Sequence, residues 1–409
     1  MLNFINTALA AKKVELLRAI SPANHVQAKE EWLKEAEKGR FTNPVFTYTV
    51  DEGESLKSLE SWNHLCDRWR DISPKNNAEE LLYDLANDYI ERQRLIRTIV
   101  ADIPTGDDVS INETMSKYYG KTDSKLVDLA YELAGGKAIK FDFLDSLPQK
   151  LSDETVKECT SRIYNAEDLK RMFEAVLEDY KLQNTWKVII DDEHSAIAVS
   201  TLTNEGDSRI FIPRTREVSE IKAIQLAGHE IECHVRHNEN CVRLLTENFN
   251  IPRDIAAKLV SDRDGTITEG FAKISDAIIG KKCTGKPDGA PAPWYIIAAD
   301  LASKGESFAK ITERLHTEYG VALNSCFTYT IRVFRGCHDT SNLHRFSRQA
   351  DRTYLEGYVE AIALREQGSL LSDFAKFDQA TMDRIGSLIG EPVTYLPHLR
   401  IAEGIINGL

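Results

Sequence analysis

Residues 229–234 read His-Glu-Ile-Glu-Cys-His, which places two histidines five residues apart and a glutamate directly after the first. Two neutral imidazoles can hold a metal ion, and an adjacent carboxylate can act as a base toward a water molecule on that ion. Zinc hydrolases use this combination, although their common motif separates the histidines by four residues. The stretch therefore predicts a zinc centre built on a helix.

The five-residue spacing does not fit a regular α-helix. An α-helix turns about 100° per residue, so a side chain five positions on points about 140° away, whereas one four positions on lies within about 40°. His229 and His234 can therefore meet one ion only if the helix widens locally, as a π-type turn with its i→i+5 pattern allows. The alternative is that His229 pairs with Cys233, which lies four residues on and is also a zinc ligand type. Spacing alone slightly favours this alternative.

The composition limits the possible partners and the compartment. The chain has 409 residues and a net charge of −13, which argues against nucleic acid or a lipid surface as a partner. Its seven cysteines are scattered, odd in number and without a Cys-x-x-Cys pair, as expected for reduced thiols rather than a disulfide framework. Neither a signal peptide nor an apolar run of membrane-spanning length is evident. We therefore expect a cytoplasmic protein with no membrane association, whereas its oligomeric state is left open.

The order of elements predicts two regions, packed as one compact unit. Residues 1–170 are expected to form an N-terminal, mainly helical region, with helical apolar spacing as in Leu81–Val100. Residues 171–409 are expected to form the catalytic region. It opens with three short β-type runs that predict a small antiparallel meander, at residues 186–190, 196–201 and 209–212. A helix is then expected to start after Pro213 and to lead into the histidine pair.

A third metal ligand should follow downstream, and Glu269 is the candidate. The apolar stripe of the helix around it lies roughly opposite Glu269, which shares its side with Lys273 and Asp276. By periodicity alone this side is a solvated face with a Glu–Lys pair, and Asp276 an exposed aspartate. Metal binding instead requires that this polar side face the histidine helix, where Asp276 could orient a ligand histidine.

Taken together, the motifs resemble the tyrosine carboxypeptidase family. That family includes microtubule-associated tyrosine carboxypeptidase and the flavohemoglobin expression-modulating proteins with a QEGLA or EEGLA motif. Its pattern is a His-Glu-x-x-x-His helix followed by three further motifs and preceded by an N-terminal match. In this chain the ordered set lies at Asn43–Phe46, His229–His234, Glu269–Ala272, Arg332–Gly336 and Asp351–Gly357.

The resemblance implies a zinc-dependent metallocarboxypeptidase that releases an aromatic C-terminal residue (Tyr or Phe) from a peptide or protein. The implied zinc ligands are His229, His234 and Glu269, with Glu230 as the catalytic base that activates the zinc-bound water. The terminal carboxylate of the substrate would be gripped by Arg335 or Arg332, with Tyr354 as a hydrogen-bond donor. Cys233 becomes a packing residue.

The implied fold is α+β and predominantly helical, a zincin-like metallopeptidase with a small antiparallel sheet beside the metal-bearing helix. One departure from the family pattern is Thr268, where the family has an acidic or amide residue. It supports an alternative function, a catalytically weak or inactive zinc-binding or regulatory protein of the same fold. A metalloendopeptidase is the second alternative, and peptides with free or amidated C-termini distinguish it from a carboxypeptidase.

Overall fold

The computed structural model describes residues 4–5, 14–139, 141–192, 197–200, 207–261, 265–287, 290–367, 373–374 and 376–389. Most of these residues are helical, so the expectation of a predominantly helical α+β chain is confirmed. The helices of the first part are α2 (Leu16–Ile20), α3 (His25–Ala36), α4 (Glu52–Arg70), α5 (Asn77–Asp102), η1 (Ile103–Thr105), α6 (Asp108–Tyr119), α7 (Ser124–Ala134), α8 (Asp142–Ser146), α9 (Asp153–Ser161) and α10 (Ala166–Asp179). The later ones are α11 (Glu220–Ala227), η2 (Gly228–Val235), α12 (Arg236–Phe249), α13 (Arg253–Ser261), α14 (Thr266–Thr284), α15 (Trp294–Ser303), α16 (Phe308–Thr317), α17 (Leu323–Val333), η3 (Ala350–Arg352), α18 (Thr353–Glu366) and α19 (Gln379–Ile389). The described part contains no helix with the length and apolar character that a membrane crossing requires.

The strands lie close to their expected positions, but their arrangement differs from the expected meander. The five strands are β1 (Ile163–Tyr164), β2 (Trp186–Asp191), β3 (Ala198–Ser200), β4 (Ser208–Pro213) and β5 (Val218–Ser219). In the larger sheet the order is β2-β4-β3, with β4 antiparallel to β3 but parallel to β2. The prediction of a purely antiparallel meander was therefore wrong.

The physical reason lies in which face of the sheet is covered. A purely antiparallel sheet can leave one face in water, whereas parallel pairing goes with a well-covered sheet. The middle strand β4 has Ile210 and Ile212 fully buried, and both pack in one cluster with Phe173 and Leu177 of α10. Alternating apolar residues predict a strand and its buried face, but they do not specify its neighbour.

The helix before the histidines also starts later than expected. Residues 218–219 form the strand β5, which pairs with β1, and α11 begins only at Glu220. Ser219 caps α11 by accepting a hydrogen bond from the Lys222 backbone N–H, a favourable N-terminal arrangement. Glu220 is buried and accepts hydrogen bonds from Arg162 and Tyr164, which ties the helix start to β1. A polar cap thus decides where the helix begins.

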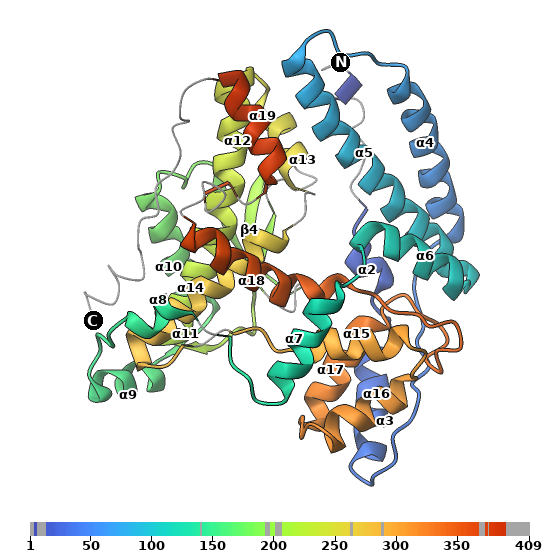
Figure 1. Cartoon of the computed structure of the whole chain (residues 1–409), viewed down its shortest axis with the longest axis vertical. Helices are drawn as coiled ribbons and strands as arrows, with labels where there is room; N and C mark the ends of the chain where they lie inside the picture. The colour runs from blue at the N-terminus through green and yellow to red at the C-terminus, as the bar shows by residue number, and fades with distance from the viewer. Residues whose placement is uncertain are drawn as a thin grey trace.

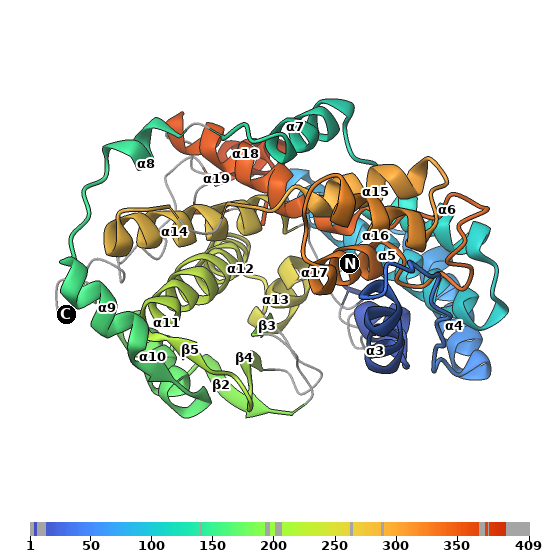
Figure 2. The ribbon, with the colours of Figure 1, turned by 90° about the horizontal axis from the view of Figure 1, so that it is seen from below.

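Helices stack in layers above the larger sheet (Figure 2). The continuous run α11–η2–α12 lies over the strands, α14 lies on that run, and α18 lies on α14. A glycine faces the neighbouring helix at both helix–helix contacts. A side chain on Gly228 of η2 would come within 2.8 Å of Ser275 Oγ on α14, and one on Gly270 of α14 would lie 1.9 Å from the Gly357 carbonyl oxygen on α18. Close helix packing therefore depends on these glycines.

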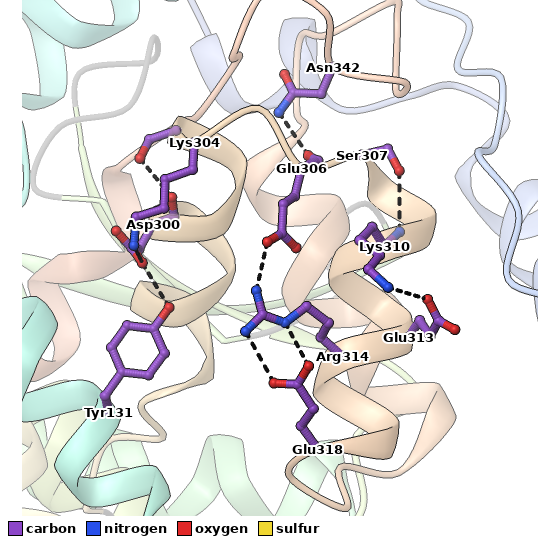
Figure 3. A network of polar contacts seen from close by, with 11 residues as sticks. Tyr131, Asp300, Lys304, Glu306, Ser307, Lys310, Glu313, Arg314, Glu318 and Asn342 are labelled. Atoms are coloured by element: carbon purple, nitrogen blue, oxygen red, sulfur yellow. Dashed lines mark hydrogen bonds and ion pairs between the residues drawn. The ribbon is translucent and has the colours of Figure 1, made fainter.

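Residues from the two expected regions share one core. Helices α15–α17 lie beside α3 and α6 on the right of Figure 1. Their buried side chains, among them Phe308 and Phe327, form one cluster with buried residues of the first 130, among them Trp32 and Ile99. Figure 3 shows how polar contacts join α7, α15 and α16: Tyr131 and Lys304 donate to Asp300, and Arg314 pairs with Glu306 and Glu318.

The cysteines form no disulfide. All seven are buried and free, so the expectation of reduced thiols is confirmed.

Candidate metal centre

A π-helix carries the two histidines. The helix η2 covers Gly228–Val235, between the α-helices α11 and α12, so the predicted local widening is confirmed. It brings the imidazole rings of His229 and His234 to a centroid separation of 5.1 Å. Both side chains are partly exposed, at 13% and 20%. The histidines therefore face the same partly accessible space.

Cys233 does not join this pair. Its side chain is buried in an apolar cluster with Phe271 and Ile274 of α14, and burial raises the pKa of its thiol. A thiol held neutral by its surroundings is a poor metal ligand, because zinc binds the thiolate. The expectation that Cys233 is a packing residue agrees with this position.

Donor atoms gather between the two histidines. One ligand atom each from His229, Glu230 and His234 can be chosen so that all lie within 4.8 Å of one another, a cluster that could hold a metal ion. Glu269 of α14 also reaches this point. Its Oε1 lies 3.7 Å from His229 Nε2, and its Oε2 lies 3.4 Å from His234 Nε2. Two imidazoles and two carboxylates therefore converge from two packed helices.

The polar side of α14 faces the histidine helix rather than solvent. The expectation of an exposed Asp276 was wrong, since its side chain is only 5% exposed and its Oδ2 lies 3.2 Å from His229 Nδ1. Lys273 lies 3.5 Å from the same carboxylate oxygen. Periodicity gave the right grouping of Glu269, Lys273 and Asp276 on one side, but a polar side can face a buried site as well as water.

Mutual charge effects set the protonation states of the metal-free cluster. Burial lowers the pKa of His229, but the hydrogen bond to Asp276 and the charges of the nearby carboxylates outweigh it and raise that pKa to about 9. Burial raises the pKa of Glu269, yet the two histidines bring it down to about 2. For Glu230 burial dominates and raises the pKa, against the lowering effect of both histidines. The two glutamates thus differ in acidity although they are neighbours.

The helix crossing brings a third group of residues to the site. Gly270, directly after Glu269, meets Gly357 of α18, and Gly357 in turn meets the carbonyl oxygen of Thr266. Tyr354 lies one turn before Gly357. Burial is the largest cause that raises the pKa of Tyr354, and the negative charge of Glu269 is the next. The role of these glycines is therefore steric: they permit the contact that sets Tyr354 near Glu269.

Arg332 and Arg335 differ in their surroundings. Arg332 donates to Asp351 at 2.8 Å and lies 5.0 Å from the centre of the Tyr295 ring. Asp351 also accepts from the buried Arg348 at 3.0 Å, so its carboxylate is already shared. Arg335 is partly buried, and no residue in the described part of the chain forms an ion pair or hydrogen bond with its guanidinium. Burial, together with Arg348 and Arg332, lowers the pKa of Arg335 to about 10.

The arginines adjoin the metal cluster through Tyr354. The Tyr354 ring lies 5.8 Å from that of Tyr295 and 5.9 Å from Lys273 Nζ, and its pKa responds to both Glu269 and Arg332. Among the described residues, Arg335 is linked to this group through the charges of Arg332 and Arg348. The structure therefore brings the other six proposed site residues into one neighbourhood. Asp276, Arg348 and Tyr295 belong to it as well. Of these, Asp276 was detectable from the sequence, because it follows Glu269 by seven residues, two helical turns.

Comparison of this chain with models of known protein families gives no match, and neither does comparison with curated proteins or with solved structures.

Proposed function

We propose that this chain is a zinc-dependent metallocarboxypeptidase that releases the C-terminal residue of a peptide or protein. The observation that carries the proposal is the position of Glu269, whose two oxygens lie 3.7 and 3.4 Å from the Nε2 atoms of His229 and His234. The motif resemblance to tyrosine carboxypeptidases supports the same activity and a zincin-like arrangement.

The donor set fits a zinc ion. Two ligands bound tetrahedrally to one zinc ion at about 2.1 Å lie about 3.4 Å apart, close to the separations between Glu269 and the histidines. A direct hydrogen bond would be shorter, at about 2.7–3.2 Å. The cluster also contains the three carboxylates of Glu230, Glu269 and Asp276, and a divalent cation would offset this excess of negative charge. His229, His234 and Glu269 would be the ligands.

The remaining residues take their roles from position. Asp276 accepts the Nδ1 proton of His229, which fixes the tautomer whose Nε2 is free to bind the metal. A bound zinc ion supplies an acidified water and polarises the scissile carbonyl. Glu230, buried beside the histidines, takes a proton from the attacking water and passes it to the nitrogen of the leaving amine as the C–N bond breaks. Its raised pKa suits both proton transfers.

Arg335, which pairs with no residue in the described part of the chain, supports exopeptidase specificity. A partly buried guanidinium without a counter-ion is costly, and a substrate carboxylate would supply the missing charge with two parallel hydrogen bonds. Arg332 is already engaged with Asp351, so Arg335 is the better candidate for the clamp, with Tyr354 as an added donor. Tyr295, in ring contact with Tyr329 and Tyr354, offers an aromatic surface for a Tyr or Phe side chain.

The two alternatives make different demands on the site. An inactive zinc-binding protein would follow if Thr268 had replaced a necessary ligand. Thr268 is fully buried, however, whereas its neighbour Glu269 contacts both histidines. An endopeptidase would have no use for the Arg335 guanidinium, which has no ion-pair partner among the described residues.

The deciding experiment compares peptides that end in Tyr or Phe as the free acid with the same peptides as C-terminal amides. A carboxypeptidase cleaves the free acids and largely spares the amides, with zinc bound in the protein. Equal cleavage of both sets would favour the endopeptidase, and zinc-loaded protein without any cleavage would favour the binding protein.

A further inference from the structure

The segment that carries Arg335 is held in place by two side chains from the N-terminal part of the chain. It follows α17 as a turn that runs from Phe334, fully buried in the core, to Gly336 and on to Asp339. Gly336 has a φ of +88°, and a side chain there would lie 2.8 Å from Met115 Cε on α6. The turn is therefore packed tightly against the first hundred or so residues of the chain.

The first of these side chains is Asp108, at the start of α6 and only 5% exposed. Its Oδ1 accepts the backbone N–H of His338 at 2.8 Å and lies 3.1 Å from His338 Nδ1. Its Oδ2 accepts the backbone N–H of Asp339 at 2.8 Å, and the Cys337 thiol lies 3.5 Å from the same oxygen. A single carboxylate thus binds three consecutive residues of the turn.

The second side chain is Tyr48, in the extended segment between α3 and α4. Its hydroxyl donates to the Cys337 carbonyl oxygen at 2.8 Å and accepts from the Gly336 backbone N–H at 3.1 Å. Its ring lies 4.9 Å from that of His338. Together, Tyr48 and Asp108 satisfy the backbone donors at residues 336, 338 and 339, directly after Arg335.

This anchoring matters because, among the described residues, no ion pair or hydrogen bond fixes the position of the Arg335 guanidinium. A guanidinium with an ion-pair partner is oriented by that partner, as Arg332 is by Asp351. Among the described residues Arg335 has no such partner, and its guanidinium would gain hydration by turning outward. Its orientation therefore has to come from the backbone that carries it, and that backbone is fixed by Asp108 and Tyr48.

We propose that Asp108 and Tyr48 are positioning residues for substrate recognition, which hold the Arg335 guanidinium ready to bind the terminal carboxylate of a peptide. This inference rests on the proposed carboxypeptidase function and adds that the N-terminal region contributes to it. Neither side chain touches the reacting atoms. Both act through the turn at residues 336–339.

The test measures peptide binding by calorimetry to the zinc-loaded Glu230→Gln protein, with a tyrosine-ending peptide as the free acid and as its amide. We expect the acid to bind more tightly. Adding Asp108→Asn should reduce this preference about tenfold, because an amide opposes an N–H₂ group to one of the backbone donors. Affinity for the amide peptide should not change. Tyr48→Phe should have the same effect to a smaller degree, and it serves as the test if Asp108→Asn does not fold.

The controls separate positioning from a general loss of structure. Glu220→Gln removes another buried carboxylate with several hydrogen bonds, and it should leave the acid preference intact. In an Arg335→Gln background the preference should vanish, and Asp108→Asn should then have no additional effect. Melting curves and zinc content accompany every variant.

The outcomes distinguish this inference from the proposed function. An acid preference that survives both Asp108→Asn and Tyr48→Phe overturns the inference alone, as does an equal loss of affinity for acid and amide. No acid preference in the starting protein overturns the Arg335 clamp and this inference with it. If the Glu230→Gln proteins show the expected preference and its loss, yet the zinc-loaded protein with Glu230 intact never cleaves the peptide, the proposed activity is contradicted and the positioning role is supported.

Discussion

Gly270 of α14 faces Gly357 of α18 so closely that a side-chain carbon on Gly270 would lie 1.9 Å from the Gly357 carbonyl oxygen. Each glycine belongs to one of the motifs that suggested the function, and each follows a site residue: Glu269 by one position and Tyr354 by three. The contact therefore fixes the position of α18, which carries Tyr354, relative to α14, which carries Glu269.

Alanine at Gly270 or Gly357 should separate the two helices. We expect Gly270→Ala to lower the free energy of unfolding by about 3 kcal/mol or more, because backbone atoms of α18 cannot yield as a flexible side chain can. The matched control is Gly386→Ala in α19, where the added carbon meets nothing within 4 Å. It should be neutral or stabilising by up to about 1 kcal/mol. Chemical denaturation measures both, and equal effects at the two positions would contradict the packing argument.

Zinc content should depend on His234 and not on Cys233. Purified protein should hold about one zinc ion per chain, and His229→Ala, His234→Ala and Glu269→Gln should each lose it. Cys233→Ala should retain the ion, because this side chain packs in the core. Elemental analysis by mass spectrometry gives the stoichiometry. Loss of zinc in Cys233→Ala, with retention in His234→Ala, would restore the four-residue pairing.

Glu230→Gln should separate metal binding from catalysis. The amide keeps the volume of the side chain but cannot take a proton, so zinc content should stay near one per chain. The turnover number should fall by about 10²- to 10⁴-fold. Steady-state kinetics with a tyrosine-ending peptide measures this. A variant that retained full activity would exclude Glu230 as the base.

Substitution of Arg335 should impair substrate recognition, whereas substitution of Arg332 should mainly impair stability. Arg335→Gln should reduce kcat/KM for free-acid peptides about 100-fold, because the terminal carboxylate loses its charged partner. Cleavage of amidated peptides, already slow, should not change, and stability should not fall, since no ion pair with a described residue is broken. Arg332→Gln should instead mainly destabilise the fold, because it removes an ion pair with Asp351. Kinetics on both peptide sets and denaturation curves of both variants test the division.

Zinc binding to the metal-free protein should release protons. The pKa of His229 is raised to about 9, so at pH 7 its ring is protonated, and it must lose that proton to become a ligand. The apparent affinity should therefore increase with pH up to about 9. Asp276→Asn removes the hydrogen bond that raises this pKa and should reduce the proton release and weaken zinc binding. Calorimetry in buffers of different ionisation enthalpy detects the protons, and a pH-independent affinity between 6 and 9 would argue against the assignment.

The same charges predict how the metal-free protein responds to pH. The raised pKa of His229 stabilises the fold below about 6.5, and this contribution is lost as the pH rises through about 9. The lowered pKa of Glu269 stabilises the fold above about 4.5, and this contribution is lost as the pH falls toward about 2. The two contributions are therefore both at full strength between about pH 4.5 and 6.5, and one of them decreases on either side of this range. The difference between the melting temperatures of the metal-free and the zinc-loaded protein should be small within this pH range and should increase above pH 7.

Some of this protein follows from its sequence because the relevant constraints are local. If both histidines are to meet one ion, their five-residue spacing requires a widened helix, and η2 is such a helix. The scattered cysteines likewise indicated reduced thiols. Apolar periodicity indicated the mainly helical chain and the approximate positions of the strands. Such features depend on residues within a few positions of one another.

Other features were decided only by tertiary structure. Whether β2 would pair with β3 or β4, and whether the polar side of α14 would face solvent or the histidines, depends on which surface packs against it. The glycine contact of α14 with α18 and the hold of Asp108 on the turn after Arg335 join residues 87 to 231 positions apart. The sequence by itself therefore determined that His229 and His234 can share one metal ion only on a widened helix. Only the tertiary structure brought Glu269 and Asp276 to them, because long-range packing, unlike helical periodicity, leaves no mark at a fixed spacing in the chain.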